Sequence, residues 1–301
     1  MALALGGGGA RGYAHIGVIQ ILEERGFDIA GVAGSSMGAL VGGLYAAGKL
    51  DAYADWVQTI GYREVLRLLD PAVRAPGAFR ADKVMTRVGE LLDGVRIEQL
   101  PLPFTAVATD LLARRAVWFQ DGPLDIAVRA SIALPLMITP VMVNGRLLAD
   151  GGLMDPLPMA PTASIPADAV VAVSLNGART TSQPAAPVRE SADPHPTRGR
   201  WNQSDVPVPD RVGAAVKTIT TGSGEATSLP AGLRAPDIVS LSIEAVEDLL
   251  IRYRLAGHPP DLLIEIPTDA CRGHEFHRAI EMIEVGRRAA VAALASSGFE
   301  S

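Results

Sequence analysis

The chain has 301 residues, a formal net charge of -6 and a hydrophobic fraction of 48%, with only 5% aromatic residues. This length suits one large α/β domain or two small ones, and a core of Ala, Val, Leu and Ile suits a buried parallel sheet. The negative balance, without a basic run, argues against nucleic acid as a partner. Cys271 is the one cysteine, which excludes an internal disulfide framework and favours a reducing, cytoplasmic compartment. No apolar run is long enough to span a membrane, and the N-terminus lacks signal-peptide features.

The first predicted elements are a strand, a glycine loop and a helix. Ala2–Leu5 is a short apolar strand, and the sequence GGGGARG follows at Gly6–Gly12. Apolar residues at helical spacing then predict a helix over Tyr13–Arg25. Such a loop presents free backbone N–H groups at a helix N-terminus, an arrangement that binds anions.

The glycine loop has three interpretations. Gly7, Gly9 and Gly12 satisfy the dinucleotide fingerprint G-x-G-x-x-G, but that motif also needs an acidic residue at the end of the second strand. Here the second strand runs into Gly34-Ser35-Ser36 instead, which disfavours a nucleotide site. An oxyanion hole is the second interpretation, in which each N–H donor is typically worth about 10²–10³ in rate. A turn with only a packing role is the third, and four consecutive glycines make it a poor explanation because they cost conformational entropy on folding.

Two side chains near the loop are candidates for other roles. Arg11 is either an ion pair that braces the loop or an anion contact, and we favour bracing. His15 lies one turn into the predicted helix beside an apolar residue. A catalytic histidine is needed in a serine triad, but this position favours a hydrogen-bonded packing histidine over a general base.

A G-x-S-x-G motif follows the second strand. Ile29–Ala33 is a short buried strand, and Ala39–Lys49 reads as a helix of small and apolar residues. Strand, sharp turn and helix form the context of a nucleophile elbow, which holds a serine in a strained backbone and lifts its hydroxyl above the sheet. Glycines on both sides avoid Cβ clashes, and the positive end of the helix favours a developing negative charge. The motif consists of Gly34, Ser35, Ser36, Met37 and Gly38.

The middle of the chain alternates helical and strand patterns. Helices are predicted over Asp51–Asp70, Ala81–Leu92 and Leu124–Ser131. A strand over Phe104–Ala108 is expected to pair as a hairpin with Ala116–Phe119.

A second hairpin ends in a candidate catalytic base. Asn144-Gly145 is a strong two-residue hairpin turn, and the returning strand ends at Asp150, followed by Gly151 and Gly152. A carboxylate at a strand end, with glycines behind it that let another backbone come close, is suited to proton transfer. An aspartate that merely opens a Gly-Gly turn is the alternative, and these residues alone leave both open.

The remainder contains a buried strand, a polar segment and two long helices. Ala169–Leu175 is the clearest buried strand, and the segment 176–210, rich in Pro, Ser, Thr and Ala, predicts a mobile insertion. A helix over 211–219, a helix over 238–255, a strand over 262–266 and a helix over 275–296 follow. His274 and His277 suit capping or surface roles, since no neighbouring ligands complete a metal site.

The order GGGGARG, GSSMG, DGG resembles the patatin-like phospholipase family, in which a glycine-rich oxyanion loop, a G-x-S-x-G elbow and an Asp-Gly-Gly or Asp-Gly-Ala segment occur in that order. The similarity covers roughly residues 2–175. It includes Arg11–Val18, Ala108–Asp110 and Ser131–Pro135, and the last helix also looks like that of small bacterial members. The segment from 176 to about 240 departs from the family pattern.

The resemblance implies a single α/β domain over 1–301, with a mostly parallel sheet between two layers of helices. It implies a Ser-Asp dyad in which Ser36 is the nucleophile and Asp150 the base, with oxyanion donors that we assign to Gly7, Gly8 and Gly9. Burial beside an apolar pocket would raise the pKa of Asp150 and improve proton transfer. Water then hydrolyses an acyl-Ser36 intermediate, and no metal or organic cofactor is required.

The implied substrate is a lipid acyl ester, such as a phospholipid or lysophospholipid, met in solution or by peripheral contact with the inner membrane surface. The resemblance carries no indication of oligomeric state. A catalytically silent regulatory or binding protein on the same fold is the alternative. The intact Ser36 and Asp150 argue against it.

Overall fold

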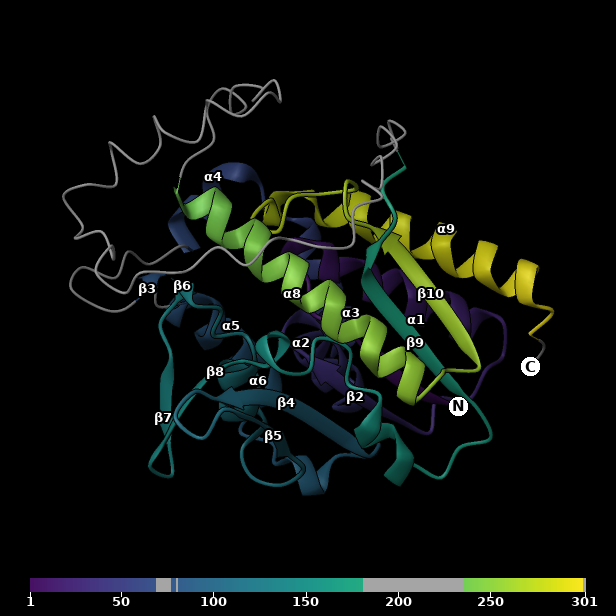
Figure 1. Ribbon diagram of the computed structural model, residues 1–301, viewed down its shortest axis with the longest axis horizontal. Coiled ribbons are helices and arrows are strands. Elements are labelled where there is room, and N and C mark those ends of the chain that lie inside the picture. The colour runs from purple at the N-terminus through teal and green to yellow at the C-terminus, as the bar shows by residue number, and fades with distance from the viewer. Residues whose placement is uncertain (69–76, 80, 181–234, 300–301) are drawn as a thin grey trace, which may run out of the picture. The chain divides into compact units, whose positions relative to one another are not determined.

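The computed structural model of the protein describes residues 1–68, 77–79, 81–180 and 235–299 (Figure 1). Its contacts divide the chain into one unit of Met1–Ser182 with Val239–Ser301 and a second of Gln183–Ile238. The first unit contains every site discussed below. Most of the predicted mobile insertion, from residue 181, and the helix predicted over 211–219 lie outside the described residues. Asn176 and Gly177 belong to a strand and not to an insertion.

An eight-stranded mixed sheet is the centre of this unit, with the strand order β10-β9-β1-β2-β4-β8-β7 and β5 paired to β4. Neighbours from β10 to β4 are parallel, as expected, and the two hairpins add β5, β8 and β7 as antiparallel strands. A separate two-stranded sheet pairs β3 (Gly77–Phe79) with β6 (Leu136–Ile138). The strands of the large sheet are β1 (Ala2–Leu5), β2 (Gly31–Ser35), β4 (Phe104–Asp110), β5 (Arg115–Phe119), β7 (Val141–Val143), β8 (Arg146–Asp150), β9 (Val170–Gly177) and β10 (Leu262–Pro267).

Helices cover both faces of the large sheet, which confirms the predicted fold class. They are α1 (Ala14–Glu24), α2 (Met37–Ala46), α3 (Leu50–Gln58), α4 (Tyr62–Leu68), α5 (Asp82–Leu92), α6 (Leu124–Ser131), α8 (Ala235–Gly257) and α9 (Ala279–Ser297). A short 3-10 helix, η1 (Gly9–Tyr13), leads into α1. Figure 1 shows α8 crossing one face of the strands, with α1 and α9 beyond them.

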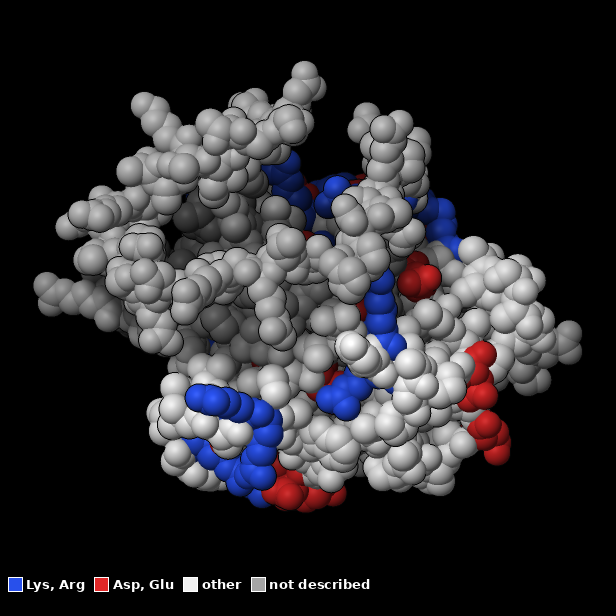
Figure 2. Space-filling model, in the orientation of Figure 1, with Lys and Arg blue, Asp and Glu red and all other residues white. Residues whose placement is uncertain are grey.

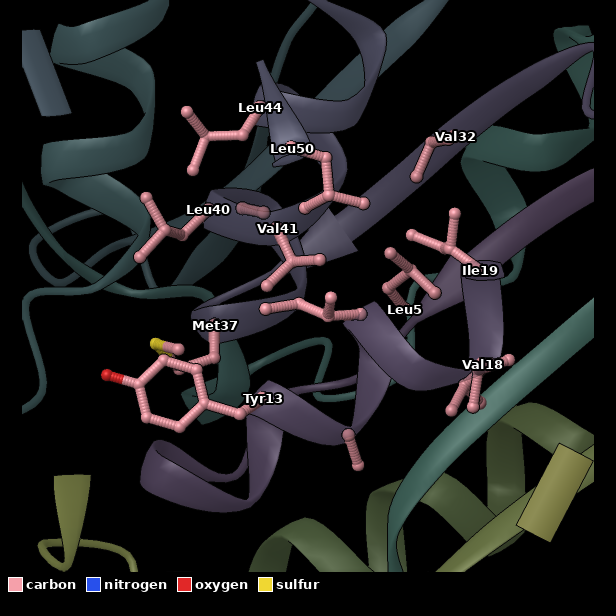
Figure 3. Close-up of a cluster of buried hydrophobic side chains, with 14 of the residues drawn as sticks. Leu5, Tyr13, Val18, Ile19, Val32, Met37, Leu40, Val41, Leu44 and Leu50 are labelled. Carbon is pink, nitrogen blue, oxygen red and sulfur yellow. The ribbon is translucent and has the colours of Figure 1, made fainter. Parts of the chain in front are cut away.

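The two faces of the sheet bury different side chains. Leu3 and Leu5 of β1 face the main core, which contains residues of α1, α2 and α9. Figure 3 shows part of this core, where Leu5 packs near Val32 and Ile19. Ala4 points the opposite way, into a smaller cluster with Ile251 of α8. The alternation of a strand thus places large residues under one layer of helices and small ones under α8.

The structure confirms one local sequence prediction and contradicts another. The Asn144-Gly145 turn is confirmed, since both residues have positive φ, 49° and 75°, as a type I′ turn requires. The helix predicted over Asp51–Asp70 is wrong, because the chain forms two helices, α3 and α4. Gly61 N–H donates to Glu64 Oε2, a capping interaction that begins a new helix.

The charged side chains lie among broad uncharged areas on the face in Figure 2, with a group of Lys and Arg next to acidic residues in the region of β5 and β7. No described helix is long and apolar enough to cross a membrane.

Candidate active site

The turn between β2 and α2 holds Ser36 in a strained backbone conformation. Its φ is 54° and its ψ is -123°, a region that residues other than glycine rarely adopt. The flanking glycines are required sterically, because a Cβ atom on Gly34 would collide with the carbonyl oxygen of Gly38, and one on Gly38 would collide with that of Leu5. The turn therefore has the features of the predicted nucleophile elbow.

Ser131, the last residue of α6, supports this turn from a neighbouring element. Its Oγ accepts a hydrogen bond from Ser36 N–H at 2.9 Å and donates one to Val107 O at 2.5 Å. Ser131 is fully buried, so its hydroxyl satisfies an N–H group that water cannot reach. The sequence placed Ser131 only within a stretch shared with the family and gave it no role.

β2 and β8 meet end to end along one edge of β4. Ser35, at the end of β2, pairs with Val107, and Asp150, at the end of β8, pairs with the next residue, Ala108. The other edge of β4 is occupied by β5 at the same two positions. Because β2 is parallel and β8 antiparallel to β4, the carboxyl ends of both strands arrive at one point. This convergence brings Ser36 and Asp150 together.

Ser36 and Asp150 form a direct hydrogen bond. Ser36 Oγ donates to Asp150 Oδ2 at 2.6 Å, and Gly152 N–H donates to Asp150 Oδ1 at 2.8 Å. The two side chains are 9% and 2% exposed. Burial raises the pKa of Asp150 to about 6, although both hydrogen bonds act to lower it. Asp150 is therefore a stronger base than an exposed aspartate and is still ionised at neutral pH.

The two glycines after Asp150 allow the end of β8 to lie against the end of β2. A Cβ atom on Gly151 would collide with Val107 O and with Ser35 Oγ. Gly152 supplies the N–H group that orients the carboxylate. The Asp-Gly-Gly segment thus combines both interpretations of the sequence: it is a turn, and the turn aims the aspartate at Ser36.

The glycine loop lies against the same serine. A Cβ atom on Gly7 would be 3.3 Å from Ser36 Cβ. However, Gly7 N–H donates to Pro156 O at 2.9 Å, which argues against Gly7 as an oxyanion donor. Within the described chain, the N–H groups of Gly8 and Gly9 have no hydrogen-bond acceptor. These two amides remain the candidate donors.

Arg11 and Gly12 fix the loop to its surroundings. Buried Arg11 donates through Nη1 to the carbonyls of Thr268 and Cys271, each at 3.4 Å, and its Nη2 lies 3.6 Å from Glu244 Oε1. These contacts are those of a bracing residue. A Cβ atom on Gly12 would collide with the side chain of Met37, so this glycine lets η1 pack on the start of α2.

His15 does not join the dyad. It is fully buried, and its Nε2 donates to Gly6 O at 2.8 Å. Burial lowers its pKa to about 4, so the ring is neutral at physiological pH. The packing role that the sequence favoured is confirmed.

A cavity of about 250 Å³ opens beside Ser36 and Asp150. The loop glycines and Arg11 line one part of it. Apolar side chains form much of the rest, and several come from α3, the link between α3 and α4, α4, α5 and β6: Trp56, Ile60, Val65, Val84 and Ile138. Tyr13 and Met37, which lie side by side in Figure 3, also line it. The cavity thus has a polar part at Ser36 and Asp150 and an apolar part, lined by the side chains just listed, which we call the apolar arm.

α8 forms another wall of the cavity and adds groups that sequence reasoning missed. Glu244 and Glu247, one turn apart, both face the cavity. Glu247 is 9% exposed. The two glutamates could be seen one turn apart in the sequence of this helix. Only the fold, however, shows that Glu247 lies beside Asp150.

These features place the chain in a class of α/β proteins in which the serine of a nucleophile elbow donates a hydrogen bond to a buried aspartate. Residues 3–163 match the model of the patatin-like phospholipase family. The match covers more than half of the chain, and the chain therefore belongs to the patatin-like phospholipase family and is a lipid acyl hydrolase. This confirms the family resemblance of the three motifs.

Similar proteins from other organisms support this finding. The chain is 48% identical to an uncharacterized NTE family protein of Mycobacterium tuberculosis, over 98% of this chain and 91% of that protein. It is 33% identical to lysophospholipase nte1 of Emericella nidulans and 35% identical to human patatin-like phospholipase domain-containing protein 6. These two matches cover 58% of this chain but only 12% and 13% of those proteins.

A solved structure supports the fold alone. VipD from Legionella pneumophila superposes with a TM-score of 0.51 and 15% sequence identity, over 98% of this chain and 66% of that chain.

Proposed function

We propose that this enzyme hydrolyses fatty acyl esters of phospholipids or lysophospholipids, with Ser36 as nucleophile and Asp150 as general base. The observation that carries the proposal is the 2.6 Å hydrogen bond from Ser36 Oγ to Asp150 Oδ2 at the wall of a largely apolar cavity. Lysophospholipase names among the relatives support this substrate class.

In the first half-reaction, Asp150 takes the proton of Ser36 as Oγ attacks the carbonyl carbon of the ester. The negative charge moves to the carbonyl oxygen, where the N–H groups of Gly8 and Gly9 stabilise it. The tetrahedral intermediate collapses, the bond to the alcohol breaks, and Asp150 returns its proton to the leaving oxygen. Acyl-Ser36 and a free alcohol result.

In the second half-reaction, Asp150 accepts a proton from a water molecule that attacks the acyl carbon. Collapse of this intermediate breaks the bond to Ser36 Oγ, which regains the proton, and releases a fatty acid. The raised pKa of Asp150 supports both steps, because a base works best when its pKa approaches the working pH.

Covalent labelling separates this proposal from a silent binding protein. A fluorophosphonate probe is expected to label the wild type and not Ser36→Ala. Release of fatty acid from phospholipid and lysophospholipid panels then identifies the ester that is cleaved. A wild type that is folded, unlabelled and inactive on all of these lipids would favour the binding protein.

We also propose that the enzyme contacts membranes peripherally through α8. Val246, Leu249 and Tyr253 lie at helical spacing on this helix and are 53%, 53% and 71% exposed. Exposed apolar residues on one side of a helix suit the interface of a bilayer. Co-sedimentation with anionic and zwitterionic vesicles tests this: Leu249→Glu should weaken binding, whereas a solvent-facing change on another helix, Glu284→Gln, should not.

A further inference from the structure

Glu247 lies beside Asp150, yet the Ser36–Asp150 mechanism does not use it. A Cβ atom added to Gly152 would be 2.6 Å from Glu247 Oε1 and 3.1 Å from Asp150 Oδ1. The two carboxyl groups are therefore near neighbours across the space that the missing side chain leaves. Glu247 is nine-tenths buried and lines the cavity that contains Ser36.

Arg11 shares the cavity with Glu247 but forms no ion pair with it, because Arg11 pairs with Glu244 and donates to two backbone carbonyls. Within the described part of the chain, no residue forms a hydrogen bond or an ion pair with Glu247, and no three acidic, His or Cys side chains gather to hold a metal ion. The titratable groups that face it or share its cavity are Asp150 from β8, Glu244 from α8, Arg11 from η1, and His274, Tyr13 and Tyr53.

The electrostatics of the two carboxyl groups differ. Burial, together with the nearby Asp150 and Glu244, raises the pKa of Glu247 to about 8, and Arg11 acts in the opposite direction. Asp150 is also buried, but it accepts hydrogen bonds from Ser36 and Gly152 that favour its anion. Two carboxylates this close cannot both ionise readily, so the one whose anion accepts more hydrogen bonds ionises first. Asp150 is that group.

We propose that Glu247 is a positioning residue that stays protonated at neutral pH, so that Asp150 is the single anion beside Ser36 and α8 can close against the dyad. The inference rests on the proposed function. The second half of α8 is fixed independently, by Ile251 in the core and by Arg254 Nε at 3.1 Å from Asp155 Oδ1. When Glu247 ionises, repulsion from Asp150 moves the first half away and admits water to the oxyanion site.

The pH dependence of kcat/KM on an uncharged ester tests this. The wild type should lose activity above about pH 8, and Glu247→Gln should extend the plateau by at least about one pH unit. The fall below pH 6 should be the same in both, because Glu247 is neutral there in the wild type. Asp248→Asn is the matched control, since it removes an adjacent carboxylate that pairs with Arg252, and it should keep the alkaline fall.

Two results would overturn the proposal. One is a Glu247→Gln profile that superimposes on that of the wild type. The other is a folded Glu247→Gln enzyme without activity at any pH, which would make Glu247 a proton-transferring group.

Infrared titration gives a readout that does not need turnover. In the wild type without substrate, a protonated carboxyl band should persist at neutral pH, disappear about one unit above the pKa of Glu247, and be missing from Glu247→Gln. Absence of such a band in the wild type would also contradict the proposal. Full activity of Ser36→Ala would instead refute the proposed function.

Discussion

At the scale of single residues, the proposed mechanism depends on how one aspartate is solvated. Asp150 is almost completely buried, and burial alone would favour its neutral form. The hydrogen bonds from Ser36 and Gly152 offset part of this effect. The result is a carboxylate that is ionised at neutral pH and basic enough to accept a proton from serine.

The acid limb of the pH–rate profile should report this aspartate. The base must be ionised to act, so kcat/KM should fall about tenfold per pH unit below about pH 6. Asp155→Asn is the control, because burial also raises the pKa of Asp155 to about 6. If that variant lost the acid limb, Asp155 and not Asp150 would be the titrating group.

Ser131 is distant from Ser36 in the sequence, but we expect its substitution to lower both stability and activity. Ser131→Ala leaves the buried Ser36 N–H without an acceptor, which should lower the free energy of unfolding by ~1–3 kcal/mol. Displacement of the nucleophile should reduce kcat by about 10²-fold. Chemical denaturation and initial rates measure both effects. Ser164→Ala, which removes a hydroxyl bonded only to Pro161 O, should change neither, and a Ser131→Ala enzyme with wild-type kcat would contradict the role.

At the scale of elements, the site exists because two strands end against each other on β4. The elbow strand and the aspartate strand approach from opposite directions and stop at Val107 and Ala108. Glycines on both sides of the junction permit the contact. A side chain at Gly151 would collide with both Val107 of β4 and Ser35 of β2.

Gly151→Ala tests that junction. Its methyl group would collide with Val107 O and Ser35 Oγ, so we expect a loss of ~1–3 kcal/mol in stability and a large loss of activity from displaced Asp150. Gly89→Ala, in the open interior of α5, is the matched control and should stabilise by up to about 1 kcal/mol. Thermal unfolding distinguishes them, and equal behaviour of the two variants would refute the steric argument.

Local signals in the sequence were sufficient for most elements near the site. The bounds of α6 were predicted correctly, as was the Asn144-Gly145 turn, because both depend on nearby residues. The approach of the end of β8 to the end of β2 could not be predicted, since it depends on which edge of β4 each strand occupies. The bond from Gly7 to Pro156 and the approach of Glu247 have the same origin: each partner is distant in the chain.

At the scale of the whole unit, the sheet, α3, α4, α5 and α8 enclose a cavity with chemistry at one place and apolar lining elsewhere. An ester that buries its acyl chain against the apolar lining is stabilised by the hydrophobic effect, and its carbonyl group then lies near Ser36. The size of the apolar arm should therefore limit the chain length of the substrate.

Filling the arm tests this relation. Val84 lines the cavity from α5, and Val84→Trp should lower kcat/KM for long-chain p-nitrophenyl esters by about tenfold or more, ~1.4 kcal/mol, with little effect on short-chain esters. Val291→Trp, at a 37% exposed position on α9, controls for added bulk. A parallel loss on short and long esters would mean that the arm does not hold the acyl chain.

The most direct test of the account is hydrolysis of a short-chain p-nitrophenyl ester by the wild type, Ser36→Ala and Asp150→Asn, with folding checked by circular dichroism. We predict that both folded variants lose about 10²–10⁴-fold or more of the wild-type kcat, since one lacks the nucleophile and the other its base. Wild-type turnover by folded Ser36→Ala would contradict the central assignment, and wild-type turnover by Asp150→Asn alone would contradict Asp150 as the base.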